Sequence, residues 1–142
     1  MNDTELLSRF ESQMISRSAW SHRLHVRMAY LYLRQYPFEA AAARIRTGIQ
    51  RLNAANSVPE NPGAGYNETV TIAWARIVAM TICQQGPAAT SDEFVDRQPH
   101  LLCSTLLRLF YSPAIWTERD CKSRFVEPDL APLALPRPQQ AD

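Results

Sequence analysis

The chain has 142 residues, of which 46% are hydrophobic and 20% charged, and its formal net charge is +1. This length and composition are typical of one globular domain with a continuous core. The near-neutral charge excludes an electrostatic argument for nucleic acid, and no apolar run is long enough to span a membrane, so we expect neither partner.

Apolar residues at helical spacing predict three helices in the first part of the chain, over residues 4–15, 21–35 and 38–56. Asp3 and Ser21 are the expected N-caps of the first two helices. Pro37 should end the second helix, because a proline disfavours helical geometry at the residue before it. Residues 57–66 hold two prolines and two glycines and predict a loop.

Asn67 is expected to cap a fourth helix that runs to about residue 83. Its body, residues 70–80, is apolar on nearly every side, which is typical of a helix in the middle of a bundle. After a loop over residues 84–90, the pattern predicts a short helix capped by Ser91, further helical packing over 101–111, and a last helix from Pro113 to about residue 125.

These elements together predict an all-α, single-domain bundle of about five to six helices over residues 1–133, with a central apolar helix and an extended, disordered tail over residues 134–142. Cys83, Cys103 and Cys121 form no C-x-x-C pair, and the acidic start of the chain has no apolar run. Both features predict reduced thiols and a cytoplasmic location. The oligomeric state stays open.

Two histidines lie on the second predicted helix. Arg23, Arg27 and Arg34 fall on one face of it, and this stripe predicts the solvent face. His25 points almost opposite to the stripe, and His22 lies one turn earlier on a neighbouring line of the helix. We therefore expect both imidazoles to turn inward and His25 to be buried.

Histidines three residues apart can share a metal ion, and they can also act as general acid and base, since the unperturbed imidazole pKa is near neutral. The structural alternative is that Trp20 and His25 pack together as a hydrophobic staple at the start of the helix.

Asn67 and Glu68 open the fourth helix directly after the Pro/Gly loop. A glutamate in a first helical turn is stabilised by the helix dipole without any functional role. In the functional alternative, both residues face the histidines across the core, and Tyr66 and Thr71 add hydroxyl groups. One carboxylate with two imidazoles is a metal set or a proton-relay set, so a divalent metal is the one cofactor that the sequence suggests.

Arg76 is the only charge in the apolar fourth helix. A buried guanidinium needs an acid or a bound anion, because an unpaired buried charge is costly. Glu127 or Asp129, in the predicted non-helical segment, can fold back as a structural clasp; a site for a substrate anion is the alternative. His100 follows a proline in a connector and is expected on the surface.

Four motifs carry a resemblance to an uncharacterised family of small bacterial proteins: W-S-H-R-L-H at 20–25, A-R-I-R-T-G-I with L-N-A-A at 43–55, G-Y-N-E-T at 65–69 and F-V-E-P-D-L at 125–130. The family has no established activity. The resemblance implies that His22, His25, Glu68 and Glu127 or Asp129 form one site. The chain has Asn67 where the family usually has histidine, and an amide oxygen suits first-row transition metals poorly, which argues against metal binding here.

Two functions stay open. One is acid–base or metal-assisted chemistry on a small molecule by His22, His25 and Glu68, with ligand contacts from the other polar residues singled out above: Tyr66, Asn67, Thr71, Arg76, Glu127 and Asp129. The other is a non-catalytic module that binds a small molecule or a protein, with structural histidines in its core. The chain has no nucleophile elbow, phosphate-binding loop or dinucleotide motif, so whether it is an enzyme is left open.

Overall fold

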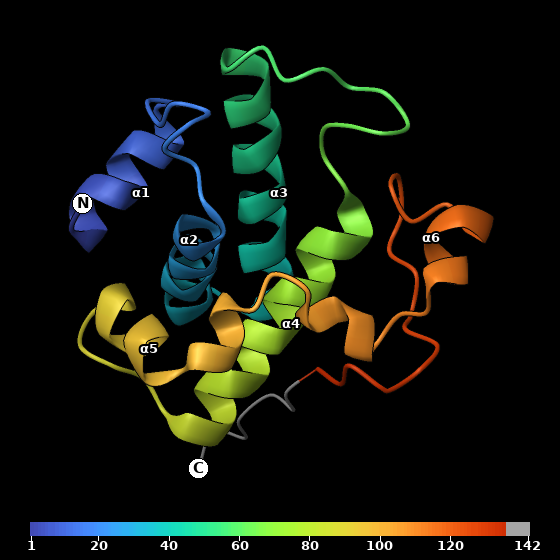
Figure 1. The fold of residues 1–142 in the computed structure, drawn as a ribbon. Helices are drawn as coiled ribbons and strands as arrows, with labels where there is room; N and C mark the ends of the chain where they lie inside the picture. The colour runs from blue at the N-terminus through green and yellow to red at the C-terminus, as the bar shows by residue number, and fades with distance from the viewer. Residues whose placement is uncertain (136–142) are drawn as a thin grey trace.

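Residues 1–135, the part described by this computed structural model, form six α-helices and two short 3-10 helices and contain no strand (Figure 1). The prediction of an all-α fold is confirmed. The helices are α1 (Asp3–Glu11), α2 (His22–Gln35), α3 (Phe38–Ala55), α4 (Glu68–Gln85), α5 (Ser91–Arg97), η1 (Pro99–Leu102), η2 (Leu106–Leu109) and α6 (Pro113–Glu118).

The core lies between α2, α3 and α4. α2 packs against α1, α3, α4 and α5, and α4 packs against both α2 and α3. α4 is buried along most of its length, as its apolar sequence predicted, and Trp74 and Val78 are among its most deeply buried side chains. A close contact joins α1 to α3, because a side-chain carbon at Gly48 would come within 2.2 Å of the Phe10 ring.

The long helices begin and end where their local signals predicted. The Ser21 hydroxyl accepts from the Leu24 N–H at 3.2 Å, and the Asn67 side chain accepts from the Val70 N–H at 3.0 Å. These bonds satisfy N–H groups that have no partner within a helix's first turn. Pro37 separates α2 from α3.

The shorter elements differ from the prediction. α1 ends at Glu11 rather than near residue 15, because the chain turns at Gln13 with a left-handed φ of 57°. Its N-cap is Asn2 rather than Asp3, and the cap of α5 is Thr90 rather than Ser91. Asp3 and Ser91, the two residues predicted as caps, hydrogen-bond to each other instead: the Ser91 N–H donates to the Asp3 carboxylate at 2.9 Å.

The C-terminal third is less helical than predicted. In place of helical packing over residues 101–111, the chain forms two 3-10 turns, η1 and η2, over residues 99–102 and 106–109, and α6 ends after six residues at Glu118. Beyond α6, the Cys121 and Lys122 carbonyls accept from the N–H groups of Thr69 and Glu68, at 3.0 and 2.9 Å. The segment after α6 is therefore held at the start of α4, which prevents those carbonyls from continuing a helix.

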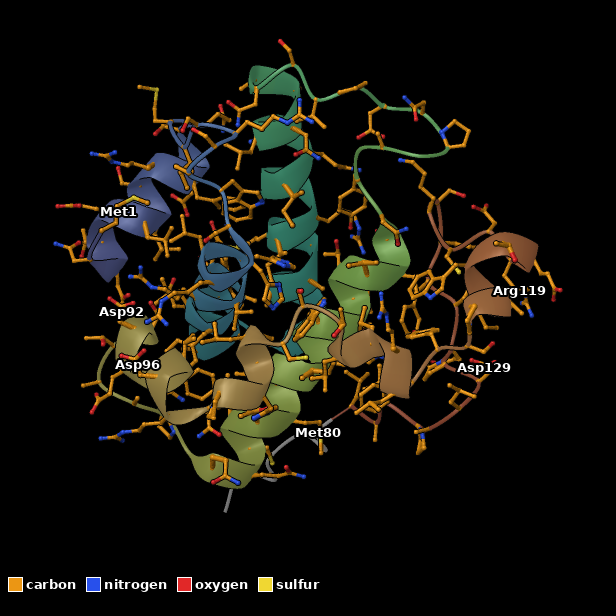
Figure 2. The ribbon with its side chains drawn as sticks, in the orientation of Figure 1. Met1, Met80, Asp92, Asp96, Arg119 and Asp129 are labelled. Carbon is orange, nitrogen blue, oxygen red and sulfur yellow. The ribbon has the colours of Figure 1, made fainter. Side chains whose placement is uncertain are left out.

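The charged face of α2 is not the solvent face throughout. Arg34 is exposed, but Arg27 is only 4% exposed, so the prediction for Arg27 is wrong. α1 and α5 cover this residue, and its guanidinium donates to the Ser91 hydroxyl and to the Met1 carbonyl, both at 2.8 Å. Asp92 and Asp96 of α5 pair with Arg23 at 2.9 Å. Figure 2 shows both aspartates on the same side of the molecule as Met1.

Two further predictions concern the surface. Cys83 and Cys103 are exposed and Cys121 is buried, and all three are free thiols, as predicted. No helix within residues 1–135 has the length and apolar character needed to cross a membrane. The tail predicted for residues 134–142 lies outside the described residues from residue 136 onward.

Candidate functional site

A small cavity lies where the loop before α4 meets α2 and α3. Its volume is about 220 Å³, and we call it the His25 cavity. The rings of Trp20, just before α2, and of His25 line one side, α3 lines a second, and the start of α4 with its preceding loop lines a third, and the cavity is open to solvent. The lining residues are Trp20, His25, Ile49, Asn53, Gly65, Tyr66, Asn67, Val70 and Thr71. Four of the residues predicted for a site therefore line one cavity: His25, Tyr66, Asn67 and Thr71.

His25 carries the most unusual polar atom of the cavity wall. The residue is half-buried rather than buried as predicted, but its Nε2 is shielded from solvent and within residues 1–135 has no hydrogen-bond partner. Its ring centroid lies 6.1 Å from that of Trp20, the contact expected of a staple. Burial, and to a smaller degree the nearby His22, lowers the pKa of His25 to about 4, so the imidazole is neutral at pH 7.

His22 has a structural partner. Its Nε2 lies 2.8 Å from the Leu101 carbonyl oxygen, which can only accept, so this nitrogen carries the proton and donates. The ring meets the Trp74 indole edge-on with 4.5 Å between centroids. His22 therefore fastens η1 to α2, and its ring centroid is 6.4 Å from that of His25.

Glu68 is fully engaged by two neighbours. Arg46 of α3 donates from Nε to its carboxylate at 2.9 and 3.0 Å, and the Tyr66 hydroxyl donates to Oε2 at 2.7 Å. Burial acts to raise the pKa of Glu68, but the hydrogen bonds from Arg46 and Tyr66 outweigh it and hold this pKa below its usual value of 4.5. The carboxylate is thus ionised and paired at neutral pH.

The predicted metal set of His22, His25 and Glu68 is not formed. No group of three or more histidine, cysteine, aspartate or glutamate side chains within residues 1–135 is arranged to hold a metal ion. The reason lies in the partners of each group, since Glu68 is bound by Arg46 and the Nε2 of His22 is bound by a backbone carbonyl. The side-chain oxygen of Asn67, a weak ligand in any case, caps α4.

Arg76 forms the predicted clasp with the C-terminal segment. Its Nη1 donates to the Glu127 carboxylate at 3.1 and 3.2 Å and to the Leu133 carbonyl at 2.9 Å, and its guanidinium stacks 4.3 Å from the Phe125 ring centroid. Asp129 accepts instead from the Ser112 N–H at 2.8 Å. None of these acids or Arg76 lines the His25 cavity, so the structure does not bring them into one site with His25.

His100 is exposed, as predicted, and its Nε2 lies 3.2 Å from the Thr81 hydroxyl. It does not line the cavity.

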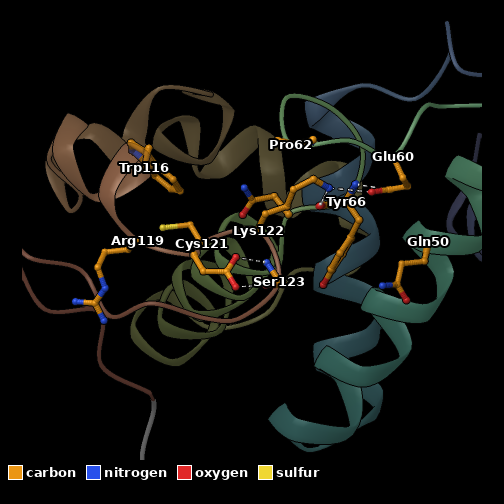
Figure 3. Close-up of a pocket in the computed structure, with 11 residues that line it drawn as sticks. Gln50, Glu60, Pro62, Tyr66, Trp116, Arg119, Cys121, Lys122 and Ser123 are labelled. Carbon is orange, nitrogen blue, oxygen red and sulfur yellow. Dashed lines mark hydrogen bonds and ion pairs between the residues drawn. The ribbon is translucent and has the colours of Figure 1, made fainter.

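A larger hollow, which the sequence did not predict, lies on the other side of the loop before α4 (Figure 3). This groove has a volume of about 830 Å³ and is lined by Gln50, Glu60, Pro62, Tyr66, Asn67, Trp116, Arg119, Asp120, Cys121, Lys122 and Ser123. Its residues come from two segments of the chain, 50–67 and 116–123, which are 49 positions apart at their nearest residues. Of its lining residues, only Tyr66 and Asn67 were singled out from the sequence.

Within residues 1–135 the fold is all-α, and a small hollow without a charged lining residue lies where α2, α3 and the start of α4 meet. No family model, no curated protein and no solved structure matches the chain. The resemblance to the uncharacterised bacterial family therefore stays a prediction.

Proposed function

We propose that the chain is a non-catalytic binding protein for a small, uncharged, polar molecule held in the His25 cavity. The observation that carries this proposal is the shielded Nε2 of His25, which has no hydrogen-bond partner within the described residues although its side chain lines a cavity. A buried polar atom without a partner costs free energy, and a ligand recovers that cost if its binding turns the His25 ring so that Nε2 faces the cavity.

The lining of the cavity supports an uncharged ligand. None of its nine lining residues carries a charge at neutral pH, because the low pKa of His25 keeps the imidazole neutral. Asn53 and Thr71 offer further donors and acceptors, and Trp20, Ile49 and Val70 offer apolar surface. An ion that enters the cavity loses hydration without gaining a countercharge. An uncharged amide or azole carries no charge that must be desolvated, so it avoids this cost.

The volume of about 220 Å³ is smaller than the roughly 300–1,000 Å³ of pockets for drug-sized ligands, so we expect a ligand of few heavy atoms.

The same features favour binding over acid–base catalysis. A general acid or base works best when its pKa is near the working pH, and the pKa of His25 is well below neutral. Glu68 is ionised and already accepts from Arg46 and Tyr66. Of the residues singled out as a catalytic set, Glu68 is thus engaged by Arg46 and Tyr66, and His25 is a weak base at neutral pH.

The test uses NMR spectroscopy of the ring resonances of His25 while small probes are titrated into the full chain. The probes are acetamide and pyrazole, which are uncharged, and acetate, which matches acetamide in shape but carries a charge. We expect saturable shifts of the His25 ring with acetamide or pyrazole and none with acetate. His25→Phe should abolish the effect on neighbouring cavity resonances such as those of Thr71, and His100→Phe should leave it unchanged.

If neither uncharged probe gives a saturable shift, or if acetate shifts the ring equally, the proposal is wrong and His25 is a core histidine only.

A further inference from the structure

A row of aromatic rings connects Trp20, in the wall of the His25 cavity, with Tyr32 of α2. The Phe10 ring of α1 lies between them. Its centroid is 5.6 Å from that of Trp20, with the two rings nearly parallel, and 6.0 Å from that of Tyr32. Phe10 is fully buried, and its ring fits against α3 because Gly48 has no side chain there. Trp20 and Tyr32 are therefore close neighbours on either side of one fixed ring.

The Tyr32 hydroxyl is bound to a carboxylate. It donates to Oε1 of Glu11 at 2.9 Å, and Glu11 has no ion-pair partner within residues 1–135. Tyr32 is 4% exposed, and burial together with this hydrogen bond raises the pKa of its phenol, so the proton stays on the oxygen at neutral pH. A phenol that loses an electron becomes a strong acid, and Glu11 is placed to accept its proton.

Three of the other tyrosines lack such an acceptor. The hydroxyls of Tyr30 and Tyr111 each donate to a backbone carbonyl, which does not take up a proton at neutral pH. The hydroxyl of Tyr66 donates to Glu68, but the pairing with Arg46 holds the pKa of this carboxyl below its usual value and makes it a weaker base. Oxidation of these three phenols is therefore less favourable than oxidation of Tyr32.

Tyr36 continues the row beyond Tyr32, with 6.2 Å between the two ring centroids. The Arg44 guanidinium lies over the Tyr36 ring, 4.2 Å from its centroid. A positive charge over the face of a ring attracts its electrons and disfavours the removal of one of them. The row therefore favours Tyr32 over Tyr36 as the place where an oxidising equivalent stops.

We propose that Tyr32 and Glu11 form the end of a radical-transfer path that starts at Trp20. A one-electron oxidant, such as a small inorganic radical, removes an electron from the indole, which loses its N–H proton to water. The indolyl radical then takes an electron from Tyr32 while the phenol proton moves to Glu11, and the indole nitrogen takes up a proton from water. The products are intact Trp20, a Tyr32 phenoxyl radical and protonated Glu11.

The path leads from the His25 cavity to a different hollow. Trp20 lines the cavity, whereas Tyr32 and Glu11 line an open hollow of about 570 Å³ between α1, α2 and α3. Glu11 is exposed, so it can release the proton to water. The transfer therefore removes the oxidising equivalent from the wall of the cavity and leaves the ring of Trp20 unmodified.

The experiment generates tryptophan radicals in the full chain by pulse radiolysis with the azide radical, which oxidises indoles faster than phenols at neutral pH. The absorbances of the indolyl and phenoxyl radicals are followed together. In the wild type we expect the indolyl signal to decay as the phenoxyl signal rises, at a rate independent of protein concentration. Tyr32→Phe keeps the ring beside Phe10 and should remove most of the phenoxyl signal, and Trp20→Phe should do the same.

Glu11→Gln tests the proton acceptor separately from the rings. The amide oxygen can still accept from the Tyr32 hydroxyl but does not take up its proton, so the rise of the phenoxyl signal should slow about tenfold or more. Glu93→Gln is the matched control, since it changes a glutamate of α5 that does not contact the row. It should leave the rate unchanged.

Trp116 and Tyr111 provide a comparison within the same molecule. Their ring centroids are 5.0 Å apart, closer than any two rings between Trp20 and Tyr32, but the Tyr111 hydroxyl donates to a carbonyl. Tyr111→Phe should therefore leave the yield and the rate of the phenoxyl signal unchanged. Urea unfolding of each variant shows that the compared proteins are folded.

The path is wrong if the phenoxyl radical forms at a rate proportional to protein concentration, or if folded Tyr32→Phe keeps the wild-type yield. An unchanged rate in Glu11→Gln, or loss of the signal in Tyr111→Phe instead, also overturns it. No ligand is present in this experiment, so its result is independent of the probe titration. A negative titration with transfer to Tyr32 overturns the proposed function and leaves the path standing.

Discussion

Arg46 of α3 and Glu68 of α4 form an ion pair in which the arginine Nε lies 2.9 Å from one carboxylate oxygen and 3.0 Å from the other. The Glu68 side chain is 12% exposed and that of Arg46 38%, so the pair is partly withdrawn from water. The pair joins two of the three main helices and also orients the Tyr66 hydroxyl. It therefore supports the wall of the His25 cavity rather than reacting within it.

Glu68→Gln should lower the free energy of unfolding by about 1–3 kcal/mol at pH 7, because the Arg46 guanidinium loses its charged acceptor in a partly buried place. The pKa of Glu68 is below its usual value, so its contribution is present above about pH 4.5 and is lost as the pH falls through the lowered pKa. Urea unfolding at pH 7 measures the difference.

Glu93→Gln is the control for this prediction. Glu93 pairs with Arg97 one turn along α5, and both side chains are more than a third exposed. We expect a change within about 0.5 kcal/mol. Equal effects of Glu68→Gln and Glu93→Gln would show that the Arg46 pair behaves as an ordinary surface pair.

Local signals and long-range contacts differ in how well the sequence predicts them. Ser21, Pro37 and Asn67 act on their own neighbours, and the helices they begin or end are as predicted. Arg76 was paired correctly with Glu127, because a lone charge in an apolar helix requires an acid nearby. Arg46 lies on a helix with several charges, and nothing in its spacing singled out Glu68, 22 positions away, as its partner.

His25 should make the protein less stable in mild acid. Burial lowers its pKa in the folded state to about 4, against about 6.5 when unfolded. The neutral form is thus favoured by folding, and stability is fully present above pH 6.5. The free energy of unfolding falls by up to about 3 kcal/mol as the pH drops from about 6.5 to about 4, because the unfolded chain takes up a proton in this range before the folded chain does.

The measurement is the free energy of unfolding in urea at pH 7.5, 6, 5 and 4.5, for the wild type and His25→Phe. His25→Phe keeps an aromatic ring beside Trp20 but cannot bind a proton, so its stability should fall much less over this range. His100→Phe, at an exposed histidine, should keep the wild-type slope. A wild-type slope in His25→Phe contradicts the prediction.

The candidate site was predicted in part. The inward direction of His25 follows from helix geometry, and Tyr66, Asn67 and Thr71 follow from their place at the start of α4, so four residues of the cavity were named from the sequence. The predicted site of His22, His25 and Glu68 is not formed. The Leu101 carbonyl binds His22 and Arg46 binds Glu68, and both partners come from other parts of the chain. A single sequence does not reveal such competing partners.

Arg27 is where the sequence pattern misled most, and it gives the last prediction. Its Nε donates to the Ser91 hydroxyl at 2.8 Å, and its Nη2 donates to the Met1 carbonyl at 2.8 Å and to Asp3 at 3.3 Å. These bonds join α1, α2 and α5 around one buried guanidinium. Arg27→Met fills a similar volume but leaves Asp3 without its buried countercharge, which should cost about 2–4 kcal/mol in the free energy of unfolding.

Arg34→Met separates this effect from the loss of any arginine on α2. Arg34 lies on the same predicted stripe but is exposed, so the change should stay within about 0.5 kcal/mol. Amide hydrogen exchange adds a local measurement, since Arg27→Met should speed exchange in α1 and at the start of α5 more than in α3 and α4. Equal stability of the two variants, with α1 protected in both, would mean that the apolar contacts of Leu6 and Phe10 hold α1 in place and that the guanidinium contributes nothing measurable.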